Sequence, residues 1–354
     1  MKKIKWMDGK IKMFRFNCDY LEGAHPKILE RLIATNEEQT PGYGEDLYTA
    51  SAKEKIKEAC ACPDAKVYFL VGGTQTNVTV LDSLLKNYEG VLSADTGHIN
   101  VHEAGAVELT GHKVITVPAE NGKLSPEKAR AYMKGFYNDV AWTHMVRPGA
   151  MYISHPSEYG TLYTEAELAE LRAICDEYGM KLFLDGARLG FGLAAEGTDV
   201  TLPKIAKYCD AFYIGGTKIG ALFGEAVVFT RKEDGAYFFT EIKQHGALLA
   251  KGRLLGVQFD AFFTDGLYME ISKKAVAQAM RIRRAFEKKG YRVYIDSPTN
   301  QQFFVIGEQK LSSLLKNVVV DDWGVIDAEN NHVIRVTTSW ATKDEAVDYL
   351  IDLL

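Results

Sequence analysis

A lysine and an aspartate each follow a short apolar segment, and these two residues carry most of the chemistry that the sequence suggests. Residues 210–214 run into two glycines, a threonine and Lys218, and residues 180–184 run into Asp185. Glycine lets the backbone approach a ligand closely, so Lys218 is expected at a strand end, partly shielded from water. Shielding favours the uncharged amine, which can attack a carbonyl carbon. A Gly-Gly-Thr-Lys run on its own is more often a solvated loop.

The combination of Lys218 with Asp185 outweighs that simpler interpretation. An aldehyde cofactor with a basic ring nitrogen needs both groups: a lysine that bonds to the aldehyde carbon, and a carboxylate that keeps the ring nitrogen protonated so that the ring can accept electrons. Pyridoxal 5'-phosphate is such a compound. The sequence therefore predicts pyridoxal phosphate as the cofactor.

Other predicted strand ends offer groups that suit the same cofactor. Gly73 and Thr74 follow a strand and open a helical pattern, where free backbone N–H groups can bind a phosphate. His98 follows the next strand and can lie flat against a ring or move a proton, whereas His102 is expected to be structural. Glu158 lies in the loop after a later strand, where a carboxylate can act as a base or bind a polar group of the substrate.

Composition places the chain among ordinary globular proteins and excludes several classes of function. It has 354 residues, of which 47% are hydrophobic and 25% charged, and a net charge of −5 gives no reason to expect a nucleic acid or an anionic membrane as partner. Neither a signal peptide nor a membrane span is expected. The five irregularly spaced cysteines favour free thiols in a reducing cytoplasm, and Cys60 and Cys62 lack a matching pair, so no metal site is predicted.

Short apolar strands alternate with amphipathic helices, which predicts a mostly parallel α/β sheet. Strands are expected at residues 66–71, 90–94, 113–117, 150–154, 181–185, 211–214 and 226–230. Helices are expected after Ser125 and Thr164. After residue 246 the pattern changes to a helical region ending near residue 289, strands at 292–295, 302–306 and 333–337, and a helix from residue 342. We therefore expect a large domain over residues 1–250 and a smaller α+β domain over residues 251–354.

The order of the motifs resembles the low-specificity L-threonine aldolases, which are pyridoxal phosphate enzymes of the β-eliminating lyase group with the aspartate aminotransferase type of fold (fold type I). The resemblance extends over most of the chain and rests on Pro41-Gly-Tyr43-Gly-Glu-Asp46, Gly73-Thr74-Gln75, His98 with Glu103-Ala-Gly105, Asp185-Gly-Ala-Arg188, Thr217-Lys218 and Val333-Ile-Arg335-Val-Thr-Thr.

The resemblance implies a role for each residue that would hold the cofactor. Lys218 would bond to it covalently, Asp185 would contact the ring nitrogen and His98 would stack on the ring. Gly73 and Thr74 would hold the phosphate.

The resemblance also implies residues for the substrate. Arg335 would be the main clamp for the substrate carboxylate, and Arg188 would lie near both the cofactor oxygen and that carboxylate, since a guanidinium offers two parallel donors. Cys18, in a stretch that reads Arg-Ser-Asp in many members, would contact the substrate. Tyr43 would lie near the active site of a neighbouring subunit, because family members form dimers or tetramers.

The implied reaction is retro-aldol cleavage of L-threonine or L-allo-threonine to glycine and an aldehyde. The base for the β-hydroxyl proton is His98, Glu158 or a water held by either. Glu158 stands where the family often has a histidine, and we hypothesise that it holds this water. A β-eliminating lyase that releases ammonia and a keto acid is the main alternative; an aminotransferase and a non-catalytic sensor are further ones.

Overall fold

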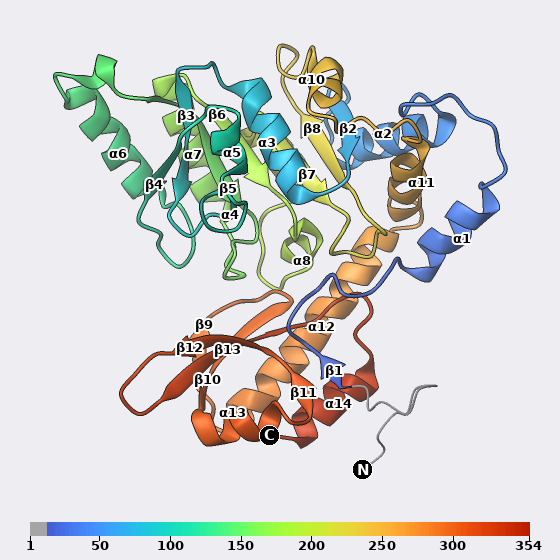
Figure 1. Ribbon diagram of the computed structural model, residues 1–354, viewed down its shortest axis with the longest axis vertical. Helices are drawn as coiled ribbons and strands as arrows, with labels where there is room; N and C mark the ends of the chain where they lie inside the picture. Colours follow the sequence, from blue (N-terminus) through green and yellow to red (C-terminus); the bar gives the residue numbers. More distant parts are fainter. Residues whose placement is uncertain (1–12) are drawn as a thin grey trace.

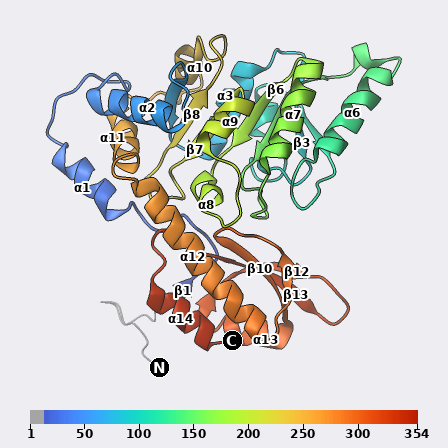
Figure 2. The same cartoon turned by 180° about the vertical axis from the view of Figure 1, so that it is seen from behind.

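The computed structural model describes residues 13–354 and arranges them in a large domain and a small domain, with the long helix α12 (Leu267–Lys288) running from one to the other (Figures 1 and 2). No helix in this part of the chain is long and apolar enough to cross a membrane. The five cysteines all lie in this part and are free thiols.

A seven-stranded sheet in the order β2-β8-β7-β6-β5-β3-β4 forms the centre of the large domain. Its strands are β2 (Lys66–Leu70), β3 (Glu89–Ala94), β4 (Val114–Val117), β5 (Arg147–Ser154), β6 (Lys181–Asp185), β7 (Ala211–Gly215) and β8 (Glu225–Phe229). Only β8 in this sheet is reversed, being antiparallel to β2 and β7, whereas the other pairs are parallel. The predicted mostly parallel sheet is confirmed.

Side chains on successive strand positions point to opposite faces of the sheet, and each face has its own apolar core. Helices α3 (Gly73–Leu84), α4 (His98–Val101), α5 (Ala106–Leu109) and α10 (Phe238–Gln244) contribute to one core. The opposite core is formed with α1 (Pro26–Ala34), α2 (Leu47–Ala59), α6 (Pro126–Asn138), α7 (Glu165–Tyr178), α8 (Leu189–Leu193), α9 (Leu202–Tyr208) and α11 (Arg253–Phe262). A 3-10 turn, Trp142–His144, follows α6.

Two predicted helix starts are confirmed by their caps. The Ser125 side chain accepts from the backbone N–H of Lys128, and Pro126 is the first residue of α6. Thr164 and Glu167 form a reciprocal capping box at the start of α7. Local sequence therefore fixes where both helices begin.

The small domain has a four-stranded antiparallel sheet in the order β12-β13-β10-β9. These strands are β12 (Asp321–Val325), β13 (Asn331–Thr337), β10 (Gln301–Gly307) and β9 (Val293–Ile295), with α13 (Glu308–Leu314) and α14 (Asp344–Asp352) packed nearby. Near the start of the described chain, β1 (Phe14–Arg15) pairs in parallel with β11 (Val318–Val319). The sequence did not predict β1, β11 or β12, and the domain boundary near residue 250 stays a prediction.

Gly186 provides a test of how closely β6 and β7 approach each other at the edge that carries Asp185. A Cβ atom on Gly186 would lie 1.9 Å from the carbonyl oxygen of Tyr213. We expect Gly186→Ala to lower the free energy of unfolding by at least about 1–3 kcal/mol, the usual cost of overpacking. Urea unfolding of the purified protein measures this change.

Gly135→Ala is the matched control, because Gly135 lies inside α6 and a Cβ atom there would meet nothing within 4 Å. This substitution should raise the free energy of unfolding by up to about 1 kcal/mol through helix propensity. Equal unfolding midpoints for the two variants would contradict the close approach at Gly186.

Candidate active site

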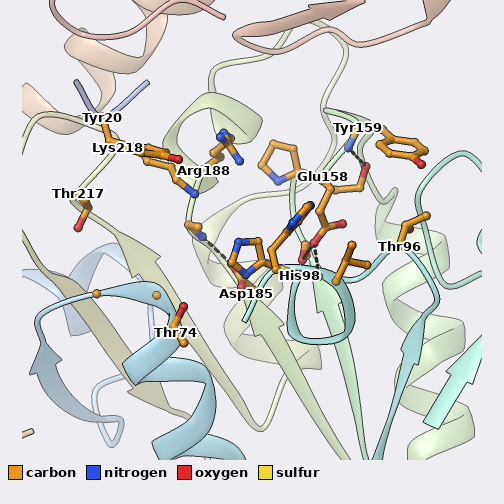
Figure 3. Close-up of a pocket in the computed structure, with 18 of the residues that line it drawn as sticks. Tyr20, Thr74, Thr96, His98, Glu158, Tyr159, Asp185, Arg188, Thr217 and Lys218 are labelled. Atoms are coloured by element: carbon orange, nitrogen blue, oxygen red, sulfur yellow. Dashed lines mark hydrogen bonds between the residues drawn. The ribbon is translucent and has the colours of Figure 1, made fainter. Parts of the chain in front are cut away.

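A pocket of about 630 Å³ opens at the carboxyl ends of the parallel strands, with the small domain supplying part of its wall (Figure 3). Eight of the residues predicted from the sequence line it: Gly73, Thr74, His98, Glu158, Asp185, Arg188, Lys218 and Arg335. They come from positions far apart in the chain, as expected for a ligand site in an open α/β sheet.

Two predicted residues do not line this pocket. Cys18 is partly buried, and Tyr43 is 45% exposed with its ring 4.9 Å from the Lys243 ammonium. The roles proposed for Cys18 and Tyr43 stay predictions.

Asp185 ends β6 and accepts four hydrogen bonds although only 4% of its surface is exposed. Its Oδ2 accepts from the Tyr152 hydroxyl at 2.6 Å and the Asn77 amide at 2.9 Å, and its Oδ1 accepts from the Tyr213 hydroxyl at 2.5 Å and the Ala187 N–H at 2.9 Å. Tyr152 and Tyr213 stand on the strands that flank β6 and share the sheet face of Asp185. The fold therefore brings both phenols to one carboxylate.

These donors keep Asp185 charged in a buried place. Burial by itself would raise the pKa of Asp185, but the positive charge of His98 and the hydroxyls of Tyr152 and Tyr213 hold that pKa below its usual value. An ionised carboxylate at this position can hold a proton on a ring nitrogen in the pocket.

His98 is connected to Asp185 through buried polar groups. Its Nδ1 lies 2.6 Å from Glu103 Oε1, and the Asn77 amide donates to Glu103 at 2.7 Å as well as to Asp185. Burial by itself would lower the pKa of His98, yet the hydrogen bond to Glu103 and the charge of Asp185 raise it overall. His98 therefore keeps its proton more readily than an isolated histidine.

Lys218 follows β7 on a tight turn, and its side-chain nitrogen has no partner within the described residues. No hydrogen bond or ion pair joins its Nζ to residues 13–354, and the Tyr20 ring centroid is 5.9 Å away (Figure 3). Burial and the charge of Arg188 lower the pKa of Lys218, which favours the uncharged amine. This agrees with the environment that the glycine-rich sequence predicts.

Glu225, which the sequence analysis missed, holds the turn that carries Lys218. It accepts from the Gly216 N–H at 3.0 Å and from the Thr217 hydroxyl at 2.8 Å, and burial raises its pKa to about 8. Its position in β8 is opposite Gly215 of β7. No local pattern marks this role, because it depends on the pairing of two strands.

The two arginines of the pocket have different partners. Asp19 accepts from Arg188 Nε at 2.7 Å and from its terminal nitrogen at 3.0 Å, which fixes the plane of that guanidinium. Arg335 on β13 forms an ion pair of 2.7 Å with Asp321, and its buried Nε has no hydrogen-bond partner in the described part of the chain. Burial and the charge of Arg188 lower the pKa of Arg335. Two neighbouring cations with unused donors suit an anionic ligand.

Glu158 lies at the opposite side of the pocket from Lys218 (Figure 3). Its Oε1 accepts from the His98 backbone N–H at 2.9 Å and from the Ser154 hydroxyl at 2.7 Å. Burial raises the pKa of Glu158 in spite of these donors. A carboxyl group that gains and loses a proton closer to neutral pH suits acid-base chemistry.

The residues of the pocket fit pyridoxal phosphate. An ionised buried carboxylate, a lysine and an imidazole lie in one cavity. Within residues 13–354 the lysine has no polar partner, and no side chain caps the first N–H groups of α3, which begins there at Gly73. A Cβ atom on Gly73 would lie 3.2 Å from the Tyr213 hydroxyl, which donates a hydrogen bond to Asp185. A side chain at this position would therefore crowd both the phosphate end and the carboxylate.

Replacing Glu103 should change the pH dependence of stability through His98. Because the pKa of His98 is raised on folding, this pair stabilises the protein fully below the ordinary histidine pKa of about 6.5, and the contribution is lost as pH rises through the higher folded value. Glu103→Gln should therefore lower the free energy of unfolding most at low pH and less at high pH, as measured by urea unfolding over a pH series.

The control is Glu108→Gln, which changes an exposed carboxylate on the neighbouring helix α5 that forms no ion pair within residues 13–354. Its effect on unfolding should be small at every pH. A Glu103→Gln effect that is constant with pH would refute the link to His98.

Known proteins resemble this chain in sequence and in structure. A family model described as Beta-eliminating lyase matches residues 17–303. The low specificity L-threonine aldolase of Pseudomonas sp. (strain NCIMB 10558) is 28% identical over 337 residues, which cover 94% of both chains. The solved structure of a threonine aldolase from Leishmania major has a TM-score of 0.92 and 37% identity, covering 96% of this chain and 98% of that chain.

A more distant neighbour shows the fold alone. An aspartate aminotransferase from Thermus thermophilus has a TM-score of 0.69 and 14% identity, with 96% of this chain and 90% of that chain covered. The aspartate aminotransferase type of fold predicted from the sequence is therefore confirmed. Together with the family match over residues 17–303, these similarities show that the chain belongs to the beta-eliminating lyase family.

Proposed function

We propose that this chain is a pyridoxal phosphate-dependent aldolase that cleaves L-threonine and related β-hydroxy-α-amino acids to glycine and an aldehyde. The lyase class and the cofactor predicted from the sequence are confirmed by the family and by the threonine aldolases that the chain resembles. The observation that carries the proposal is the placement of the unpaired Lys218 and the ionised Asp185 in one pocket with two arginines.

The protein's own residues hold the cofactor and set its charge. When bound, pyridoxal phosphate supplies an aldehyde carbon that bonds to an amine and a ring that takes up the electrons of the breaking Cα–Cβ bond. Lys218 would provide the amine, and Asp185 would keep a proton on the ring nitrogen. His98 would lie against the ring, while Gly73 and Thr74 would bind the phosphate at the start of α3.

Arg335 and Arg188 bind the substrate carboxylate in this proposal. Asp19 fixes the guanidinium plane of Arg188, and Asp321 holds one nitrogen of Arg335, so both side chains are oriented before substrate arrives. Orientation in advance lowers the entropy cost of binding. The Trp323 ring also contacts Arg335, with the guanidinium carbon 5.6 Å from the ring centroid.

Glu158 holds the water that takes the β-hydroxyl proton, or takes that proton itself. Its raised pKa and its position on the pocket wall both suit this role. His98, the other candidate base, is a weaker choice because Glu103 and Asp185 favour its protonated form.

The compartment and the oligomeric state of the enzyme are also part of the proposal. The free thiols and the absence of a membrane-crossing helix in the described residues agree with a cytoplasmic protein. The chain acts as a dimer or tetramer in which the exposed Tyr43 approaches a neighbouring subunit's pocket, and Cys18 lies on the substrate side.

Covalent trapping tests the cofactor and the reaction together. Borohydride treatment of the cofactor-loaded protein should fix the cofactor on the peptide that contains Lys218, and the untreated protein should release acetaldehyde and glycine from L-threonine. Lys218→Ala should show neither result. Trapping with release of ammonia and a keto acid would replace the aldolase by an eliminating lyase, and no trapping at all would overturn the proposal.

Glu158→Gln keeps the size of the side chain and removes its ability to accept a proton. We expect the rate of L-threonine cleavage to fall by about 10²–10⁴-fold, the usual contribution of a general base. Steady-state kinetics measure the change, and the absorption of the bound cofactor shows whether loading is preserved. An unchanged rate would remove Glu158 from the proton transfer.

A further inference from the structure

A row of four hydrogen-bonded side chains runs from Glu158 through Ser154 and Tyr152 to Asp185. The oxygen atoms of Glu158 and Ser154 are 2.7 Å apart, those of Ser154 and Tyr152 are 3.2 Å apart, and those of Tyr152 and Asp185 are 2.6 Å apart. Ser154 and Tyr152 are both on β5, two residues apart, and Ser154 is the register partner of Asp185. Sheet geometry therefore places all three on the same face.

The number of hydrogen atoms limits how these contacts can be satisfied. Ser154 and Tyr152 each carry one hydroxyl hydrogen, so each can donate only once. If Glu158 is protonated on Oε1, the oxygen that contacts Ser154, it donates to Ser154, Ser154 donates to Tyr152 and Tyr152 donates to Asp185, which makes three hydrogen bonds. If Glu158 is ionised, Ser154 donates to Glu158 instead, and no hydrogen lies between Ser154 and Tyr152.

We propose that Ser154 and Tyr152 are positioning residues that link the protonation of Glu158 to the hydrogen bond on Asp185. When Glu158 gains a proton, each hydroxyl keeps its own hydrogen and only the Ser154 hydroxyl turns, so no proton moves along the row. The Tyr152 hydroxyl then both accepts and donates, and hydrogen bonds in such a series strengthen one another. The bond to Asp185 is therefore stronger while Glu158 holds a proton.

This inference rests on the proposed function for its consequence. In that function Glu158 would take up the β-hydroxyl proton, and Asp185 would hold the proton of the ring nitrogen at the same step. The row strengthens the donor on Asp185 at the same step. Coupling between the two sites is reciprocal, so the state of Asp185 also affects the affinity of Glu158 for a proton.

Several other titratable groups face Glu158 and belong in any account of its pKa. His98 on α4 donates its backbone N–H, the charge of Asp185 acts from β6, and Tyr159 and Tyr163 lie along the chain after it. The burial that raises the pKa of Glu158 acts in the same direction as the charge of Asp185. A variant that tests the row must leave these groups in place.

Tyr152→Phe tests the row because Tyr152 does not contact Glu158. Loss of the phenol removes the acceptor that Ser154 uses only when Glu158 is protonated, so the pKa of Glu158 should fall. One neutral hydrogen bond corresponds to a fall of about half a unit to one unit. In the Ser154→Ala background, Tyr152→Phe should not lower the pKa of Glu158. In the Ser154→Thr background, which keeps a hydroxyl, Tyr152→Phe should lower this pKa again.

Tyr213→Phe is the matched control. Tyr213 donates to the other oxygen of Asp185 but is not part of the row. Any effect that reaches Glu158 through Asp185 is therefore common to the two variants, and only Tyr152→Phe should add the fall in the pKa of Glu158 that the row causes. The pKa of Glu158 is followed by infrared difference spectroscopy of the cofactor-free protein over a pH series, with Glu158→Gln identifying the carboxyl band. Equal shifts in Tyr152→Phe and Tyr213→Phe would overturn the inference.

The pH profile of kcat/KM for L-threonine is a second measurement. In Tyr152→Phe, the pKa that this profile gives for Glu158 should fall, as the pKa from infrared spectroscopy does. In the Ser154→Ala background, Tyr152→Phe should leave this pKa unchanged. A failure of the aldolase proposal would appear as missing acetaldehyde in every variant. A failure of this inference would appear in the cofactor-free protein, whatever the reaction is.

Discussion

The site depends on keeping one carboxylate ionised in the interior. A buried charge is costly unless hydrogen bonds replace the lost water, and Asp185 has only 4% of its surface exposed. Its four donors come from β5, β7, α3 and the turn after β6. They converge because parallel strands present their carboxyl ends at one edge, with alternate residues on one face. The seven-stranded sheet is thus the scaffold for this charge, and the rest of the pocket is arranged around it.

The remaining charges of the pocket separate into paired and unpaired groups. Arg188 and Arg335 each have an aspartate partner, so their positions are fixed before any ligand binds. Lys218 has none within residues 13–354, and the glycine-rich turn leaves it free to form a covalent bond. Arg335 comes from the small domain, so this wall of the pocket exists only while the two domains are packed together. In the proposed function, affinity for an amino acid is therefore tied to the domain arrangement.

The sequence predicted the parts of the site that local patterns encode. Lys218, Asp185, Gly73 and His98 each follow an apolar strand, and the rule that ligands gather at strand ends was enough to bring them together. Glu225, Tyr152 and Glu103 carry no such signal, because their roles arise from strand register and from a helix packed across the sheet. The strand β12 was missed since Asp321-Asp-Trp-Gly-Val is short and half polar. The roles of Tyr43 and Cys18 stay predictions, since neither residue lines this pocket.

One environment gives the acid-base groups of the pocket different protonation states. Burial disfavours charge on all of them, which lowers the pKa of Lys218 and raises that of Glu158. Asp185 differs from Glu158 because the charge of His98 and four hydrogen-bond donors lower its pKa in spite of burial. Groups whose pKa values are pushed apart in this way can serve as nucleophile, base and permanent anion within one cavity. The division of roles therefore follows from the neighbouring charge and the hydrogen-bond donors at each carboxylate, and not from differences in burial.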